Sequence, residues 1–182
     1  MAEGTAASPL PESFTVHAIH LVRTATQTNL ALSQMADQKA SILMGATFVV
    51  FTIAVGQAGR GNFPLSLLVL ACSAFLSALF AVAAILPSFS PPAASPDTEN
   101  ILFFGVFTRL SEEEFANRVL QRLASDETVF RTMLRDIYQN GQVLQRKKYR
   151  YLGLAYRIFL AGLTLTLVTL LLENRGALAG LF

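Results

Sequence analysis

Polar side chains at helical spacing are the first candidates for chemistry in this sequence. Asn29, Ser33 and Asp37 follow one another at intervals of four residues, so an α-helix would place them in one line. Polar groups in such a line need partners when they are buried. The line is therefore expected either to hydrogen-bond a neighbouring helix or to contact a ligand.

A second set of polar residues runs from Asp136 toward Lys147 and Lys148. On two neighbouring helices, Asp37 and Lys148 would lie at a similar depth, so an ion pair between them is an alternative to a ligand contact. Four of the five positions in 146–150 are basic. They can bind the phosphate of an anionic ligand or anionic lipid headgroups, and the simplest interpretation is that they mark the cytoplasmic side of a membrane protein.

Aromatic and histidine residues offer two further candidates. Phe103 and Phe104 can stack on a nucleobase or pack in a core. His17 and His20 have a spacing that suits a metal, but no third ligand of matching kind lies near them in the sequence, so no metal site is expected. The sequence contains no motif of the common hydrolases or dinucleotide-binding enzymes and no nucleic-acid-binding module. No catalytic residue and no enzyme activity are expected.

The composition indicates which elements must position these side chains. Of the 182 residues, 53% are hydrophobic and 14% are charged, against about 25% charged in a typical soluble domain. The mean hydropathy is +0.48. A net charge of +2 gives no reason to expect a nucleic-acid partner, and the single cysteine, Cys72, excludes an internal disulfide. These values predict a single-domain helical membrane protein.

Three segments are apolar and long enough to cross a bilayer as helices, namely residues 40–58, 63–86 and 151–172. The turn between the first two is short, so these helices are expected to be antiparallel.

Basic residues near the ends of these spans predict the orientation. Lys39 and the bases of residues 146–150 lie on one side, and Arg60 and Arg175 lie on the other. The excess of basic residues marks the cytoplasmic side, so the N-terminus is expected in the cytoplasm and residues 173–182 outside the inner membrane.

The cytoplasmic part is expected to consist of residues 1–39 and 87–150. Residues 1–13 suggest a disordered start, and residues 14–39 a helix that runs into the first span. Prolines between residues 87 and 96 end the second span.

Two helix starts are expected in the second cytoplasmic segment. Residues 101–107 are too short to cross a bilayer and can form a strand, an interfacial segment or an aromatic core. Ser111 then begins a helix that ends near Leu123, and Ser125 begins another that continues into the third span. The predicted fold is an all-α integral membrane protein, with three transmembrane helices and a cytoplasmic helical stalk.

The order of several short motifs resembles the transmembrane effectors of Pycsar antiphage systems, from about residue 17 to residue 172. The motifs are, in order, Asn29 with Leu32-Ser33, Ala36-Asp37-x-Lys39-Ala40, Asn100-Ile101-Leu102-Phe103-Phe104-Gly105, Ser111-x-x-Glu114-Phe115, Asp136-Ile137-Tyr138 and Lys148-Tyr149-x-Tyr151-Leu152.

The resemblance implies a function that composition and spacing do not show. A partner pyrimidine cyclase makes cyclic UMP or cyclic CMP on infection, and the effector senses that nucleotide and disrupts the inner membrane, which causes abortive infection. It implies the cyclic nucleotide as activating ligand and no cofactor. The small residues of the second span, among them Ser73, Ser77 and Ala81, predict self-association into a homo-oligomer. This chain has no separate β-rich nucleotide-binding module, so the ligand site must be built from the helices and the Phe103 region. The ligand-binding residues that we expect are Asn29, Ser33, Asp37, Lys39, Phe103, Phe104, Asp136, Tyr138, Lys147 and Lys148, with the bases near the phosphate and the phenylalanines near the base.

An alternative function belongs to another class. The same charged helix faces can serve a constitutive membrane scaffold or anchor that binds a cytoplasmic protein without any small-molecule ligand.

Overall fold

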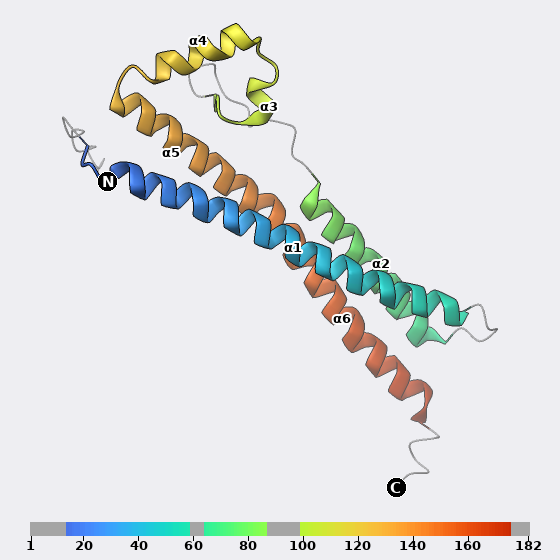
Figure 1. The fold of residues 1–182 in the computed structure, drawn as a ribbon. Coiled ribbons are helices and arrows are strands. Elements are labelled where there is room, and N and C mark those ends of the chain that lie inside the picture. Colours follow the sequence, from blue (N-terminus) through green and yellow to red (C-terminus); the bar gives the residue numbers. More distant parts are fainter. Residues whose placement is uncertain (1–13, 59–63, 87–98, 176–182) are drawn as a thin grey trace, which may run out of the picture. The chain divides into compact units, whose positions relative to one another are not determined.

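The computed structural model describes residues 14–58, 64–86 and 99–175 (Figure 1). These residues form six α-helices and one π-helical segment, and no strand occurs in the described ranges. The elements are α1 (Ala18–Ala58), α2 (Leu65–Ile85), α3 (Phe104–Phe107), α4 (Glu112–Arg122), α5 (Asp126–Val143), the π-helical segment (Leu144–Tyr149) and α6 (Arg150–Glu173). The all-α prediction is confirmed.

Three helical stretches are long and apolar enough to cross a membrane: Ala18–Gln57, Leu65–Ile85 and Asp126–Glu173. The first includes most of the predicted cytoplasmic helix as well as the first predicted span. Several predictions lie outside the described residues: the start at 1–13, most of the turn at 57–62, the proline-containing segment at 87–96 and most of the tail at 173–182.

The chain divides into two compact units. Unit one consists of residues 1–29 and 89–139, and unit two of residues 30–88 and 140–182. The divisions at 29/30 and 139/140 fall inside α1 and α5, so both helices contribute residues to both units.

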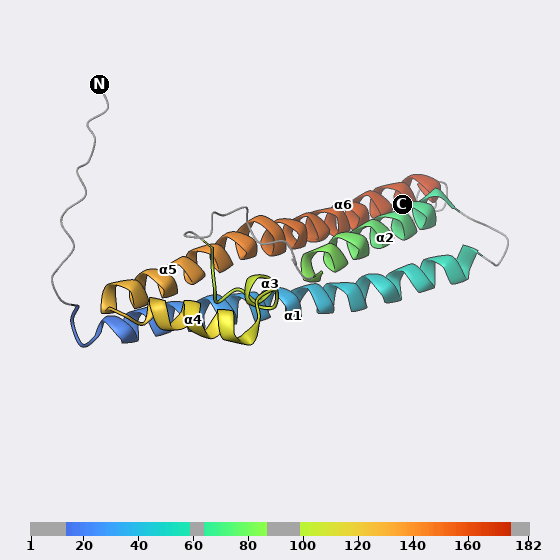
Figure 2. The ribbon, with the colours of Figure 1, turned by 90° about the horizontal axis from the view of Figure 1, so that it is seen from above.

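Small residues allow α2 and α6 to pack closely in unit two, where they run side by side (Figures 1 and 2). The Ser77 hydroxyl donates to the Ala155 carbonyl at 2.8 Å, and both residues are fully buried. A Cβ on Gly162 would overlap the side chain of Ser73. Small residues that admit close backbone approach are typical of helix pairs in membranes, where apolar side chains gain little by leaving lipid for protein.

The first helix completes the core of unit two. Ala36 and Ala40 of α1 form one buried cluster with Ala84, Leu144 and Leu152. A second cluster joins Leu43 of α1 to α2 and α6. The core therefore lies between three helices and is made mainly of alanine.

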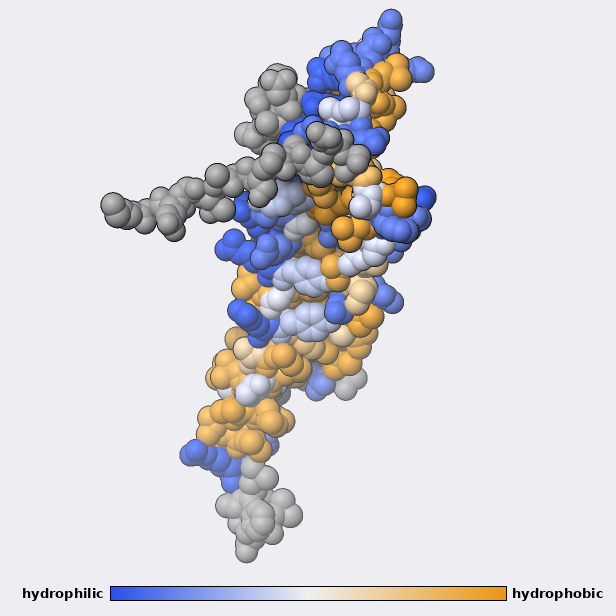
Figure 3. Space-filling view, turned by 90° about the vertical axis from the view of Figure 1, so that its left-hand side faces the viewer, coloured by the Kyte–Doolittle hydropathy of each residue, from blue (hydrophilic) through white to orange (hydrophobic). Residues whose placement is uncertain are grey.

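Large apolar side chains point outward from unit two. Exposed examples are Phe48, Val49, Phe75, Leu160 and Leu167. Figure 3 shows hydrophobic residues covering much of this part of the surface. In water such a surface would be unfavourable, whereas lipid chains solvate it, which accords with three membrane-spanning helices.

Unit one is built from the start of α1, the segment 99–103, α3, α4 and most of α5. The Ser111 hydroxyl accepts a hydrogen bond from the backbone N–H of Glu114 at 3.2 Å and caps α4, as predicted. Residues 104–107 form one helical turn, which excludes a strand among the alternatives for residues 101–107. The rings of Phe14 and Phe130 lie 4.7 Å apart and pack α5 against the residues before α1.

Candidate functional site

Two amides and one carboxylate meet in unit one, and we call Asn29, Asn100 and Asp136 the polar cluster. The Asn29 Nδ2 donates to the Ile137 carbonyl at 3.0 Å. The Asn100 Nδ2 donates to the Asp136 Oδ1 at 2.8 Å, and its Oδ1 accepts from the Leu102 N–H at 3.0 Å. The cluster therefore joins α1 and the segment before α3 to the same turn of α5.

Burial makes these hydrogen bonds structurally important. Asn100 is 3% exposed, so its amide would be costly to leave without partners. Asp136 is half-buried, and its carboxylate accepts hydrogen bonds but cannot donate them while ionised. The cluster thus presents amide donors, an amide acceptor and a carboxylate, which are the groups that read the polar edge of a nucleobase.

Aromatic rings belong to the same stretches of chain as the polar cluster. The rings of Phe103 and Phe104 are 5.3 Å apart at 50° to each other. Phe104 is 44% exposed and Tyr138 is 66% exposed. Exposed aromatic faces are suited to stacking on a base, and these rings are close to the polar cluster in the sequence.

Unit two brings together three other predicted residues. The Lys148 ammonium lies 2.6 Å from Asp37 Oδ2 and 2.8 Å from Oδ1, and it donates to the Ser33 hydroxyl at 2.8 Å. The Lys148 side chain is 20% exposed and that of Asp37 is 39% exposed. The ion pair that sequence analysis gives as the alternative to a ligand contact is therefore present.

Lys147 contacts a different helix. Its ammonium donates to the Leu86 carbonyl at 2.8 Å, at the end of α2. The last carbonyls of a helix have no partner within it and carry its negative partial charge, so a cation is favourable there. Both lysines lie in the π-helical segment, a rare conformation that is frequent at functional sites.

The predicted residues are divided between the two units. Asn29 belongs to unit one, whereas Ser33 and Asp37, which continue the same line on α1, belong to unit two. Lys39 is exposed. Among the described residues, no group of three or more histidine, cysteine, aspartate or glutamate side chains could hold a metal ion. The ligand roles of the ten predicted residues stay predictions.

Sequence reasoning missed three partners in these contacts. Asn100 was not among the predicted ligand residues, although it lies in a motif of the resemblance, because residue type alone does not show which asparagine is buried. The carbonyls of Ile137 and Leu86 gave no signal, since every residue carries one.

Comparison with known families adds the identity of the chain. The family model of the Pycsar effector protein domain matches residues 20–173. The chain matches no curated protein and no solved structure. The matched region covers well over half of the chain and includes the polar cluster, both lysines and nearly all of the three membrane-length helices. The chain therefore belongs to the Pycsar effector family, as a transmembrane effector of Pycsar defence.

Proposed function

We propose that this effector senses a cyclic pyrimidine nucleotide, cyclic UMP or cyclic CMP, and responds by disrupting the inner membrane, which causes abortive infection. Family membership supports the defence role. The observation that carries nucleotide sensing is the polar cluster of unit one, which combines one buried amide, Asn100, with a half-buried amide and carboxylate and with exposed aromatic rings nearby in the chain.

The chemistry of the polar cluster suits a pyrimidine edge. The cytosine amino group is a donor, and a carboxylate such as Asp136 can accept from it. Asparagine amides offer one acceptor and two donors, so they can pair with either uracil or cytosine. A buried polar group that is satisfied by one base and left unpaired by another gives strong discrimination. Phe104 would supply stacking on the ring, whereas Tyr138 lies about 200° around α5 from Asp136.

The membrane response would follow from a shift between two arrangements of unit two. A ligand shifts such an equilibrium only if it binds one arrangement more tightly than the other. We propose that the Lys148–Asp37 and Lys147–Leu86 contacts hold the resting arrangement and are lost in the active one. The small residues of α2 also suit self-association, and we propose that the active form is a homo-oligomer. The protein would act without enzyme activity, and a partner cyclase would supply the nucleotide.

Calorimetric titration of the purified full-length protein tests the sensing step. Cyclic UMP, cyclic CMP, cyclic AMP and cyclic GMP are compared. We expect one pyrimidine nucleotide to bind, and Asp136→Asn to weaken it about tenfold or more, because hydrogen bonds to a charged group contribute about 1.5–3 kcal/mol. Glu113→Gln, an exposed carboxylate of α4, is the matched control.

Leakage of a dye from liposomes tests the response. The nucleotide that binds should release dye from liposomes that contain the protein, and Asp136→Asn should require a correspondingly higher nucleotide concentration. If no nucleotide binds to folded protein, the proposal is wrong.

A second candidate function is a membrane scaffold that binds a cytoplasmic protein. One observation favours it: α4 buries none of its residues, and Leu120 at its end and the following Leu123 are 64% and 57% exposed. Contiguous exposed apolar patches mark interaction surfaces, and Leu120 and Leu123 are three residues apart, the spacing of neighbours on one helix face. Under this function, Leu120→Ser would abolish association with a cytoplasmic partner and no nucleotide would bind.

A further inference from the structure

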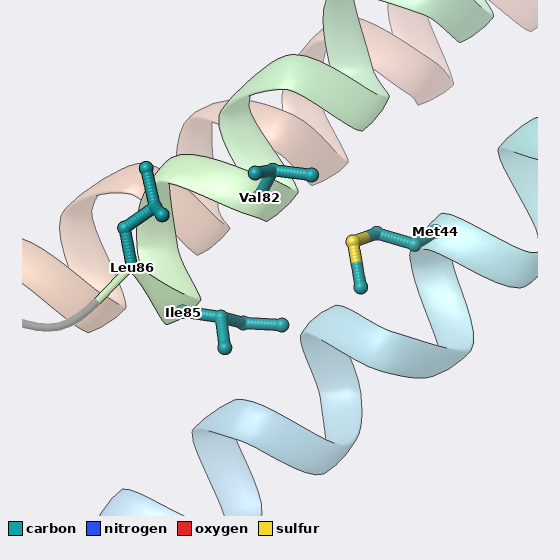
Figure 4. Close-up of a pocket in the computed structure, with 4 residues that line it drawn as sticks. All are labelled: Met44, Val82, Ile85 and Leu86. Atoms are coloured by element: carbon teal, nitrogen blue, oxygen red, sulfur yellow. The ribbon is translucent and has the colours of Figure 1, made fainter.

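A small apolar pocket lies between α1 and α2 in unit two. It has a volume of about 190 Å³ and is lined by Met44, Val82, Ile85 and Leu86. Met44 extends from α1 toward Val82 and Ile85 on α2 (Figure 4). None of the four side chains carries a hydrogen-bonding group, and an apolar cavity of this kind is poorly suited to water.

The pocket lies near one end of the membrane-spanning helices. Leu86 follows the last residue of α2, and Met44 lies close to the start of the apolar part of α1. The pocket is therefore at the depth where a phospholipid chain meets its headgroup. This end of the helices carries the basic residues 146–150, which mark the cytoplasmic side.

Positive charge adjoins the pocket. The Lys147 ammonium is 2.8 Å from the carbonyl of Leu86, a residue that lines the pocket. Arg146 and Arg150 are exposed, and neither forms an ion pair with the residues that the structure describes. The nearby carboxylate of Asp37 is already bonded to Lys148. The Lys147 ammonium thus lies at the Leu86 end of an apolar pocket, and two exposed arginines lie within three residues of Lys147 in the sequence.

We propose that this pocket binds an anionic phospholipid of the cytoplasmic leaflet. Part of an acyl chain lies against Met44, Val82 and Ile85, and the phosphate lies near Lys147, Arg146 and Arg150. A lipid is the occupant that the position favours, because the walls belong to membrane-spanning helices whose outer surface contacts lipid chains. The surplus of basic side chains selects a negative headgroup over a zwitterionic one. This inference is independent of nucleotide sensing.

Quenching of tryptophan fluorescence by brominated lipid tests the proposal. The sequence contains no tryptophan, so a single introduced tryptophan reports only on its own surroundings. Leu86→Trp places a reporter at the pocket, through a side chain that is 56% exposed and whose backbone carbonyl is unaffected. Ile42→Trp is the matched control, since Ile42 is only two residues from Met44 and is 63% exposed. Each variant is placed in phosphatidylcholine vesicles that contain a small fraction of phosphatidylglycerol with brominated chains.

A specific site quenches the two reporters differently. We expect Leu86→Trp to show a preference of about tenfold or more for phosphatidylglycerol over brominated phosphatidylcholine, and Ile42→Trp to show nearly none. Arg146→Gln with Arg150→Gln, made in the Leu86→Trp protein, should remove most or all of this preference, since each basic residue near an anionic surface contributes about 1 kcal/mol. Arg131→Gln, a basic residue of unit one, should leave it unchanged.

A second variant distinguishes the contribution of the apolar pocket from that of the basic side chains. Val82→Phe fills the pocket and should weaken quenching of Leu86→Trp by both lipids, whereas Val168→Phe, on an exposed position of α6, should not. Glycerol phosphate in solution carries the same charged group without the chains, and we expect it not to compete. Competition by glycerol phosphate would show that the site binds free phosphate, and equal quenching of the two reporters would show unselective lipid contact. Either result would overturn the proposal.

Discussion

The side chains of Lys148 and Asp37 are close enough for a strong ion pair, but both retain contact with solvent. Water and salt screen such a pair, so its contribution to stability is small. Its position matters more than its energy, because the Lys148 ammonium also binds Ser33 and ties the π-helical segment to α1. A weak contact of this kind can be broken at small cost in free energy, as the proposed change between two arrangements of unit two requires.

A double-mutant cycle measures the coupling energy between Asp37 and Lys148. Asp37→Asn and Lys148→Met are each expected to destabilise the protein slightly, and the two changes together should cost less than their sum, with a coupling of about 1 kcal/mol. Unfolding in mixed detergent micelles gives the free energies, and high salt should reduce the coupling. Additive effects would show that the pair contributes nothing to stability.

The two lysines also test the predicted phosphate contact. If both residues meet the phosphate, Lys147→Gln with Lys148→Gln should abolish nucleotide binding in calorimetry while membrane insertion is unchanged. If they only hold the resting arrangement, as proposed above, the same variant should bind the nucleotide at least as tightly as the unaltered protein. Arg131→Gln, whose side chain is paired with Glu127, is the control for loss of a basic side chain in unit one. Unchanged affinity would remove both lysines from the ligand site and leave them only their contacts with Asp37 and Leu86.

At the scale of elements, the close approach of α2 and α6 depends on one missing side chain. A Cβ on Gly162 would overlap Ser73, whereas a Cβ on Gly153 of the same helix would meet nothing within 4 Å. The glycine at 162 is therefore required by packing. The glycine at 153 has no such requirement.

These two positions give a matched pair of variants. Gly162→Ala should destabilise the protein by about 1–3 kcal/mol, the usual cost of overpacking, whereas Gly153→Ala should be neutral or slightly stabilising. Ser73→Gly should restore much of the stability of Gly162→Ala. Detergent-induced unfolding of the unaltered protein, Gly162→Ala, Gly153→Ala and the double variant Ser73→Gly/Gly162→Ala measures these differences. Equal effects of the two glycine substitutions would contradict close packing at Gly162.

The elements differ in how far the sequence predicts them. The three spans could be predicted because long uncharged stretches have few alternatives to a membrane helix, and the Ser111 cap because its side chain acts on the next turn. The π-helical segment could not be predicted, since the sequence of residues 144–149 has no pattern that distinguishes a π-helix from an α-helix. Nor could the different partners of Asn29 and Ser33, which are Ile137 and Lys148, because the partners of one helix face depend on distant chain segments.

At the scale of the whole molecule, the distribution of basic residues predicts orientation in the membrane. Alkaline phosphatase fused after residue 182 should be active, because the predicted C-terminus lies outside the inner membrane. The same enzyme fused before residue 1 should be inactive. Activity of the N-terminal fusion would show that the predicted orientation is wrong, and the proposed lipid pocket would then lie in the other leaflet.

The division of the chain into two units inside α1 and α5 restricts how parts of this protein can be exchanged. Each residue advances an α-helix by about 100°, so one residue inserted or deleted at 29/30 or at 139/140 changes the phase of one of the two helices by that angle. Two continuous helices pass from one unit to the other, so a change in only one of them puts the phases of the pair out of step. A designed chimera that replaces unit one should therefore keep the helical phase at both junctions, for instance by length changes of about seven residues.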